Sequence, residues 1–394
     1  MPALDGMRIL DMTQYEAGTS CTQALAWMGA DVVKLEAPGM GDPGRWTVQR
    51  DDYFWNWNAN KRGIALDLSK SEGRELFLQL VPKFDVFVEN YGPGVIERLD
   101  VEYETLKAVH PSLIYAQIKG FGMSGPYASF LAFDMSAQAA AGTFTVTGEA
   151  DGPPTLPGPT IGDSGTGVQL AMAILAAYVQ VLRTGEGQYI EISMQEAITY
   201  FMRTRIAHGG DWGRQASPRN GSQVGVAPSG LYPCKPGGPN DWAFVIAVTR
   251  PHIDKLYMAI DRPDLITDER FSTDQARVLN SDALQDEIAQ WTRERTKQQV
   301  MERLAGAGVP CSATLDTKDL FEDPHLVERG FVRSLEHPTE GKVRMLGFPP
   351  RMSASEVPLE RPPRLGEHTD SVLSEELGLD AERLKALREV GAIG

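Results

Sequence analysis

The fold is decided by Met7-Arg-Ile-Leu-Asp-Met12, an apolar run that predicts a short buried strand. A helical segment follows at 17–28, and Asp31-Val-Val-Lys-Leu-Glu36 is a second apolar strand. The alternation continues with strands expected at 63–68, 85–89 and 113–118 and helices at 69–81 and 103–109. Strands separated by helices of this length predict a parallel sheet with right-handed crossovers. The sequence therefore predicts a Rossmann-like α/β layer near the N-terminus.

Composition narrows the class of protein. The chain has 394 residues, 42% of them hydrophobic, which is enough for a large buried core and more than one domain. A net charge of −15 argues against nucleic acid or anionic membranes as partners. Three scattered cysteines predict neither a disulfide framework nor a zinc site. With no signal peptide at its start, the chain is expected to be soluble and cytoplasmic.

Several common cofactor and catalytic motifs are missing from the sequence. The first strand is followed by Tyr15-Glu16-Ala17-Gly18, with one glycine where a dinucleotide fingerprint has three. There is no P-loop and no Gly-x-Ser-x-Gly elbow, and the six histidines lack metal-ligand spacing. We therefore expect no metal and no permanently bound cofactor.

One acidic residue stands out between glycines. Asp163 lies in Thr160-Ile-Gly-Asp-Ser-Gly-Thr-Gly167, directly before an apolar run at 168–182. That run is hydrophobic on nearly every face, which predicts a buried helix too short to span a membrane. An aspartate at its start is either an N-cap or, if a ligand comes close, a covalent nucleophile. The residues alone leave both interpretations open.

The second half of the chain changes in character at 208–241, where Gly, Pro, Asn and Ser are frequent and predict a linker. A strand at 242–248 and helices near 250–260, 280–294 and 297–307 predict a second unit. A hairpin is expected over 331–345, turning at 338–341, and helices are expected in the tail at 376–392. Four basic residues near strand or crossover ends are candidate anion contacts: Lys61, Arg62, Arg98 and Lys119.

Short motifs spread along nearly the whole chain, in one order, carry a resemblance. They are Leu10-Asp-Met-Thr13, Gly29-Ala-Asp-Val-Val-Lys-Leu-Glu36, Asn60-Lys-Arg-Gly-Ile-Ala-Leu-Asp67, Val88-Glu-Asn-Tyr-Gly-Pro-Gly94, Lys119-Gly-Phe-Gly122, Gly125-Pro-Tyr127, Gly152-Pro-Pro-Thr155, Ile161-Gly-Asp-Ser164, Thr184-Gly-Glu-Gly-Gln188, Gly308-Val-Pro-Cys311 and Pro363-Arg-Leu-Gly-Glu-His-Thr369. The chain resembles the family III (CaiB/BaiF-type) CoA-transferases, a group that includes formyl-CoA transferase and α-methylacyl-CoA racemase.

The resemblance implies a domain organisation. A large Rossmann-like domain would be built from both chain ends, with residues 1–207 as its N-terminal part and 323–394 as its C-terminal part. Residues 208–322 would form the linker and a smaller central α+β domain. Two subunits would interlock as linked rings, as a homodimer or as a heteromer with a paralogue.

The resemblance also implies a site. Asp163 would be the nucleophile that moves coenzyme A from an acyl-CoA to a free carboxylic acid, with CoA as part of the substrate. Glu16 and Ala17 would lie near the thiol end, and formyl-CoA transferase has Gln in place of Glu16. Asn90, Tyr91, Gly92 and Arg98 would line the nucleotide, and Leu131 and Phe133 the pantetheine arm.

Three departures from the family pattern keep alternatives open. Phe133 replaces the acid/base histidine of the racemase branch, which argues against racemisation. The segment 224–230 stands where a glycine-rich flap is expected, and Ala37-Pro38 replaces a basic residue, so oxalate is not favoured as acceptor. The alternatives are an acyl-CoA racemase or dehydratase, and a non-catalytic CoA-binding subunit. The sequence names neither the donor nor the acceptor acid.

Overall fold

The computed structural model describes residues 1–47, 51–219, 225–338 and 341–394, and its chain divides into two compact units. Unit 1 comprises Met1–Thr143, Pro157–Arg203 and Arg329–Gly394, and unit 2 comprises Phe144–Leu156 and Thr204–Glu328. Residues 144–156, expected with the first domain, group with unit 2. There the Arg219 guanidinium donates hydrogen bonds to the carbonyls of Glu149 and Gly152. The division at 207 and 322 stays a prediction.

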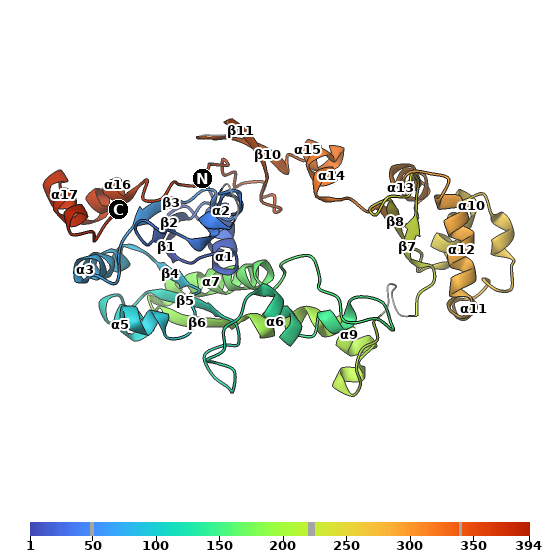
Figure 1. The fold of residues 1–394 in the computed structure, drawn as a ribbon, viewed down its shortest axis with the longest axis horizontal. Coiled ribbons are helices and arrows are strands. Elements are labelled where there is room, and N and C mark those ends of the chain that lie inside the picture. The colour runs from blue at the N-terminus through green and yellow to red at the C-terminus, as the bar shows by residue number, and fades with distance from the viewer. Residues whose placement is uncertain (48–50, 220–224, 339–340) are drawn as a thin grey trace. The chain divides into compact units, whose positions relative to one another are not determined.

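Within the described residues, unit 1 is built on a six-stranded parallel sheet in the order β3-β2-β1-β4-β5-β6 (Figure 1). Its strands are β1 (Arg8–Met12), β2 (Asp31–Glu36), β3 (Arg62–Ala65), β4 (Val86–Glu89), β5 (Ile114–Lys119) and β6 (Gln188–Ser193). The predicted α/β architecture is confirmed. The strand order reverses between β1 and β4, and the carboxyl ends of strands at such a point form a crevice for ligands.

Helices cover both faces of this sheet, each over its own apolar core. One core includes residues of α1 (Ala17–Ala26), α6 (Asp134–Ala140), α7 (Ser164–Thr184) and α8 (Met194–Thr199). The other includes residues of α3 (Ser71–Leu80), α4 (Val95–Leu99), α5 (Tyr103–Val109), α16 (Thr369–Leu377) and α17 (Ala381–Glu389). Because α16 and α17 share the second core with α3, the C-terminal residues complete the layer that the N-terminal residues begin.

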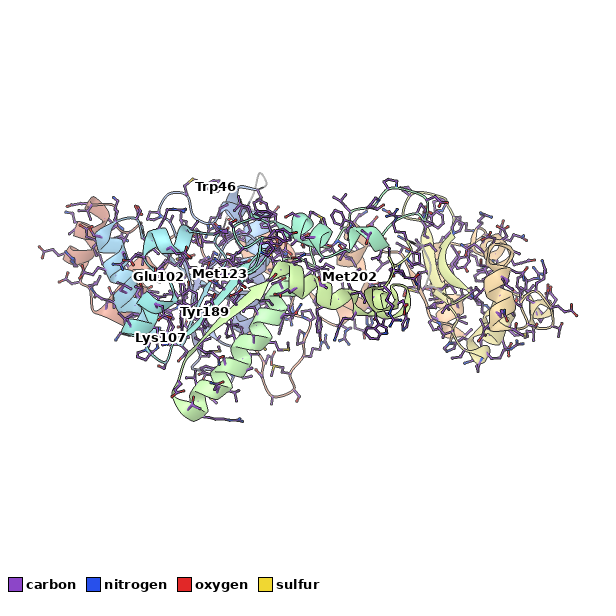
Figure 2. The ribbon with its side chains drawn as sticks, turned by 90° about the horizontal axis from the view of Figure 1, so that it is seen from below. Trp46, Glu102, Lys107, Met123, Tyr189 and Met202 are labelled. Atoms are coloured by element: carbon purple, nitrogen blue, oxygen red, sulfur yellow. The ribbon has the colours of Figure 1, made fainter. Side chains whose placement is uncertain are left out.

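Aromatic side chains pack together at the β6 edge of the sheet. Figure 2 labels Tyr189 on β6, whose ring lies 5.3 Å from that of Tyr103 and 5.9 Å from that of Tyr115. At the other edge, α2 (Asp52–Asn58) precedes β3. The hairpin of β10 (Val332–His337) and β11 (Gly341–Leu346) is also present, although residues 339–340 of its expected turn lie outside the described residues.

Unit 2 has a small antiparallel sheet in the order β7-β8-β9, formed by β7 (Ser229–Pro233), β8 (Trp242–Ile246) and β9 (Cys311–Ala313). Its helices are α9 (Arg203–His208, beginning at the unit boundary), α10 (Arg250–Ala259), α11 (Asp274–Leu279), α12 (Ser281–Thr292), α13 (Lys297–Gly306), α14 (Thr317–Glu322) and α15 (Pro324–Glu328). Tyr232, Leu256 and Ile288 are fully buried in one core between this sheet and its helices.

Helix α7 corrects two expectations. It spans 21 residues, longer than the predicted run, and it is long and apolar enough to cross a membrane by length and composition. It is buried on one face only, through Leu170, Ile174 and neighbouring small residues that pack on α1 and the sheet. Met172 and Leu182 are more than two-thirds exposed on the other face. One face of α7 therefore packs on the sheet as in a core helix. The opposite face is apolar but exposed, so the helix is not buried on every side as the sequence predicted.

Close packing of α7 on α1 depends on Gly167. A Cβ atom at this position would lie 2.1 Å from the Ser20 hydroxyl oxygen and 2.4 Å from the Ala17 carbonyl oxygen. Neither contact is sterically possible, so any side chain here would push the two helices apart. Every residue of α1 is buried, which leaves that helix no room to move.

We predict that Gly167→Ala destabilises unit 1 by about 3 kcal/mol, because overpacking at a rigid backbone contact costs roughly this much. Urea unfolding followed by circular dichroism measures the change. Gly158→Ala is the control, since a Cβ there meets nothing within 4 Å. Equal stability of the two variants would show that the helices are not held at this distance by the glycine.

Candidate functional site

A cavity of about 180 Å³ opens at the carboxyl edge of the sheet, where the strand order reverses. Chain segments that follow β1, β4, β5 and β6 form its walls together with the loop before α6 and the start of α7. The lining residues are Gln14, Tyr15, Ala17, Asn90, Tyr91, Gly92, Pro93, Ile118, Lys119, Gly120, Phe130, Leu131, Ala132, Phe133, Asp163 and Met194. Aromatic and aliphatic groups predominate in this set, so the cavity suits an apolar chain that ends at a polar group.

Most residues predicted to form the site lie around this cavity. Asp163 lines it together with Ala17, Asn90, Tyr91, Gly92, Leu131 and Phe133. Glu16 and Arg98 are not part of the lining: Glu16 is buried behind it, and Arg98 is exposed on α4. What these residues bind stays a prediction.

Sequence reasoning missed Gln14, Tyr15, Phe130 and Met194. Gln14 and Tyr15 directly follow β1 and Met194 directly follows β6, so the rule that ligands lie at the carboxyl ends of parallel strands would have found them. Phe130 carries no such signal. It lies in an irregular loop, where its ring stacks on Tyr127 at 5.3 Å.

Asp163 occupies the N-cap position of α7, yet its carboxylate makes no capping hydrogen bond. Its backbone is already helical, at φ −80° and ψ −70°. The amides of Ser164 and Gly165 therefore donate to the carbonyls of Thr160 and Ile161 rather than to the cap. The carboxylate faces the cavity instead. Because both amides already donate to carbonyls of the preceding turn, neither is free to donate to a negatively charged oxygen of a bound molecule.

Two further carboxyl groups surround Asp163. The backbone N–H of Asp163 donates to Oδ1 of Asp134, at 3.0 Å. Glu16, the residue before α1, is 3% exposed. Its Oε1 accepts from the Thr160 hydroxyl at 2.5 Å and its Oε2 from the Tyr53 hydroxyl at 3.3 Å. Glu16 is thus a buried acid held by neutral donors.

Burial and mutual repulsion change the acidity of this cluster. Burial, together with the negative charges of Glu16 and Asp134, raises the pKa of Asp163 to about 7. Burial also raises the pKa of Glu16 to about 7, while the hydrogen bond from Thr160 works against the rise. A half-buried carboxylate with a raised pKa beside a cavity has the features of a functional group.

Comparison with known proteins identifies the family. The model of CoA-transferase family III matches residues 4–369. The chain belongs to CoA-transferase family III. It is 40% identical to the formyl-CoA:oxalate CoA-transferase of Streptomyces coelicolor over 99% of both chains, and 37% identical to that of Rhodopseudomonas palustris (strain BisA53) over 99% of this chain and 97% of the relative.

Solved structures agree with this assignment. A CaiB/BaiF family protein from Brucella suis superposes with a TM-score of 0.85 at 30% identity, over 95% of this chain and 99% of that one. Rv3272 from Mycobacterium tuberculosis superposes with a TM-score of 0.81 at 26% identity, over 94% and 98%. The chain is therefore an enzyme, a family III CoA-transferase.

Three of the four basic residues expected to contact an anion form ion pairs within the protein instead. For these three the expectation is wrong. Lys61 is buried in an ion pair with Asp11, and Lys119 in one with Glu89. Arg62 pairs with Asp31 and Glu375. The sequence could not show these acids because the partners lie far along the chain. Arg98 remains exposed, with its guanidinium beside Gly94.

Asn90 and Tyr91 are fixed by their surroundings. The Asn90 side chain accepts from the Gln14 amide at 2.8 Å and donates to the Gln14 carbonyl at 2.9 Å. The Tyr91 amide donates to Glu89, and its carbonyl accepts from Lys119. These contacts fix the cavity wall at Asn90 and Tyr91, and the side-chain amide of Asn90 is already occupied. In the described part of the chain, no cluster of three or more His, Cys, Asp or Glu residues could hold a metal ion.

We predict that the side-chain carbon of Asp163 titrates with a midpoint near pH 7 in a ¹³C NMR experiment. Asp163 would be protonated below this pH and anionic above it. Glu16→Gln removes a neighbouring negative charge and should move the midpoint to lower pH. Glu196→Gln, an exposed change on α8, is the control and should leave it in place. An unchanged midpoint in Glu16→Gln would exclude the electrostatic coupling.

Proposed function

We propose that this enzyme transfers coenzyme A from an acyl-CoA to a free carboxylic acid, with Asp163 as the covalent nucleophile. The observation that carries the proposal is the uncapped carboxylate of Asp163 facing the cavity at the sheet edge. A carboxylate can accept an acyl group as an anhydride and can then be converted into a thioester with CoA. The proposed chemistry therefore needs no metal or resident cofactor.

The proposed reaction has four balanced steps. The Asp163 carboxylate attacks the thioester carbonyl of the donor, and the carbon–sulfur bond breaks to give a mixed anhydride and CoA thiolate. The thiolate attacks the aspartyl carbonyl and releases the donor acid as a carboxylate, leaving an aspartyl-CoA thioester. The acceptor carboxylate attacks this thioester and frees the thiolate again. The thiolate then attacks the acceptor carbonyl, which gives the new acyl-CoA and regenerates Asp163.

The roles of the other residues follow from their positions. Ala17 would lie near the thiol end of CoA, Leu131 beside the pantetheine arm and Gly92 beside the nucleotide, and all three line the same cavity as Asp163. Arg98 would meet a phosphate of the nucleotide. Phe133 has no exchangeable proton and its ring packs edge-on against Tyr15, at 6.0 Å, so we do not propose racemisation.

The substrates are the least constrained part of the proposal. The names of the relatives make formyl-CoA and oxalate the first donor and acceptor to assay. Ala37-Pro38 and the segment 224–230, whose residue 224 lies outside the described residues, are departures that keep a larger or dicarboxylic acid, such as succinate as donor, equally open. A non-catalytic subunit is not favoured, since the nucleophile is retained. The cytoplasmic location stays a prediction.

We predict that Asp163→Ala lowers CoA transfer at least about 1,000-fold, because a covalent route loses its nucleophile. Mass analysis after incubation with formyl-CoA and hydroxylamine should detect a hydroxamate on the Asp163 peptide of the wild type and none in Asp163→Ala. Ser164→Ala is the matched control, since its hydroxyl bonds the Thr160 carbonyl, and should still be labelled. Near-normal turnover by Asp163→Ala would remove this residue from the mechanism.

We further propose that the enzyme is a dimer that covers the exposed face of α7. Apolar side chains form a stripe at helical spacing there: Val168, Met172, Val179 and Leu182 are 44–69% exposed. A stripe of this kind is seldom left in water on a soluble protein. Of the two partners that the family resemblance allows, a second copy of this chain or a paralogue, we propose a second copy.

We predict that Met172→Asp combined with Leu182→Asp prevents dimer formation, because two charges would be buried without partners. Light scattering after gel filtration should give the monomer mass for the variant and the dimer mass for the wild type. Val390→Asp, at an exposed position after α17, should remain dimeric. A wild-type monomer at micromolar concentration would contradict the proposal.

A further inference from the structure

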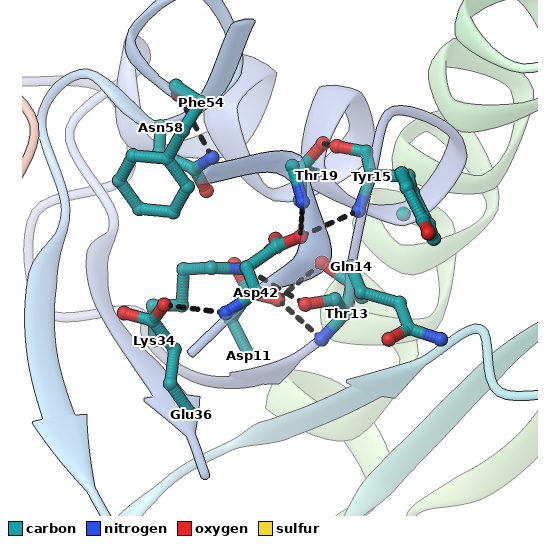
Figure 3. A network of polar contacts seen from close by, with 12 residues as sticks. Asp11, Thr13, Gln14, Tyr15, Thr19, Lys34, Glu36, Asp42, Phe54 and Asn58 are labelled. Atoms are coloured by element: carbon teal, nitrogen blue, oxygen red, sulfur yellow. Dashed lines mark hydrogen bonds and ion pairs between the residues drawn. The ribbon is translucent and has the colours of Figure 1, made fainter. Parts of the chain in front are cut away.

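The connection between β1 and α1 is held entirely by side chains. Thr13, Gln14 and Tyr15 present six backbone N–H and C=O groups, and each is bonded to a side chain. Figure 3 shows these three residues beside Asp11, Lys34 and Asp42. Asp11 and Lys34 hold Thr13, Asn90 holds Gln14, and Asp42 and Thr19 hold Tyr15. A short loop bound in this way has no freedom to rearrange.

Such binding is needed because Tyr15 has a left-handed backbone, with φ +58°. This conformation costs a non-glycine residue about 1–2 kcal/mol and persists only where surrounding contacts impose it. Oδ1 of Asp42 accepts from the Tyr15 amide at 3.0 Å, and the Thr19 hydroxyl donates to the Tyr15 carbonyl at 2.5 Å. These two contacts hold the strained residue on both sides.

Asp42 is itself fixed within buried charges. Its Oδ1 also accepts from the Gly44 amide at 2.8 Å, and its Oδ2 lies 2.9 Å from the Lys34 ammonium. The side chains of both residues are at most 1% exposed. The Asp42 amide donates to Glu36, which pairs with Arg45. Asp42 is therefore anchored more firmly than the backbone that it holds.

The ammonium of Lys34 completes the link back to the loop. It donates to the Thr13 carbonyl at 2.7 Å while its charge balances Asp42. A second buried pair, Lys61 with Asp11, supports the other end, because Asp11 accepts from the Thr13 amide. Two ion pairs in the core thus set the path of three residues at the cavity wall.

We propose that Asp42 is a positioning residue of the transferase, an inference that rests on the proposed function of the cavity. Asp42 is not among the residues that line the cavity. Through the Tyr15 amide it fixes the left-handed turn that places Gln14 and Tyr15 in the cavity wall and leads into Glu16 and α1. Loss of Asp42 would move this wall and weaken CoA binding while leaving the Asp163 carboxylate in place.

The test measures coenzyme A affinity by titration calorimetry and the KM and kcat for formyl-CoA. Asp42→Ala should weaken CoA binding about 10-fold and Asp42→Asn, which keeps an acceptor oxygen, about threefold, as expected for losing or weakening one buried hydrogen bond. KM should rise by the same factors with kcat little changed. Asp31→Asn is the matched control at the start of β2, the strand that precedes Asp42, where it breaks surface ion pairs with Arg8 and Arg62. It should leave CoA affinity unchanged.

A double-mutant cycle separates positioning from stability alone. Glycine adopts a positive φ freely, so in a Tyr15→Gly background neither Asp42 variant should weaken CoA binding further. If the losses persist unchanged in that background, or if the more conservative Asp42→Asn folds and binds CoA as tightly as the wild type, Asp42 is not a positioning residue. Should Asp42→Ala fail to fold, the Asp42→Asn cycle decides alone. Absence of hydroxamate on wild-type Asp163 would instead count against the proposed function, with the affinity comparison intact.

Discussion

The absence of a side chain at Gly167 is the constraint on which the site depends. The backbone of α7 can lie directly on the Ala17 carbonyl only because residue 167 has no Cβ. This contact brings together the starts of α1 and α7, which are distant in sequence. Glu16 precedes one helix and Asp163 the other, so the packing of two helices places two carboxyl groups near each other. Their electrostatic interaction follows from backbone geometry.

That proximity has an energetic cost that depends on pH. The folded-state pKa of Asp163 lies near 7, above the value of about 4 expected for an unfolded chain. A group of this kind contributes stability below pH 4 that is lost as the pH rises through 7, because the folded state must then hold the charge in a poorly solvated place. The free energy of unfolding is thus least favoured by this group at the pH values where Asp163 is ionised. Such a trade-off is common at functional sites.

The sequence predicted helices and strands, which have local signals, better than it predicted which side chains contact one another. Strand β2 was placed at its observed bounds because an apolar run of six residues is itself the signal. The ion pairs of Lys61 and Lys119 could not be predicted, because Asp11 and Glu89 reach them only after the sheet has formed. The left-handed turn at Tyr15 has no local signal either, since no glycine or asparagine marks it. The apolar run at 168–182 predicted a helix correctly. It could not show which face of that helix is buried within this chain and which is exposed.

The buried acids at this edge of the sheet differ in one respect that bears on their roles. Asp11, Asp42 and Glu89 each have a lysine ammonium within 2.9 Å, and all three support the backbone around the cavity. Among the described residues no such cation pairs with Asp163, and the negative charges of neighbouring acids oppose its ionisation. A carboxylate balanced by an ammonium is a weak nucleophile and a good anchor, because its charge is already stabilised. The unbalanced one is the group that gains most by forming a bond to a carbonyl carbon, since acylation removes the charge that its surroundings oppose.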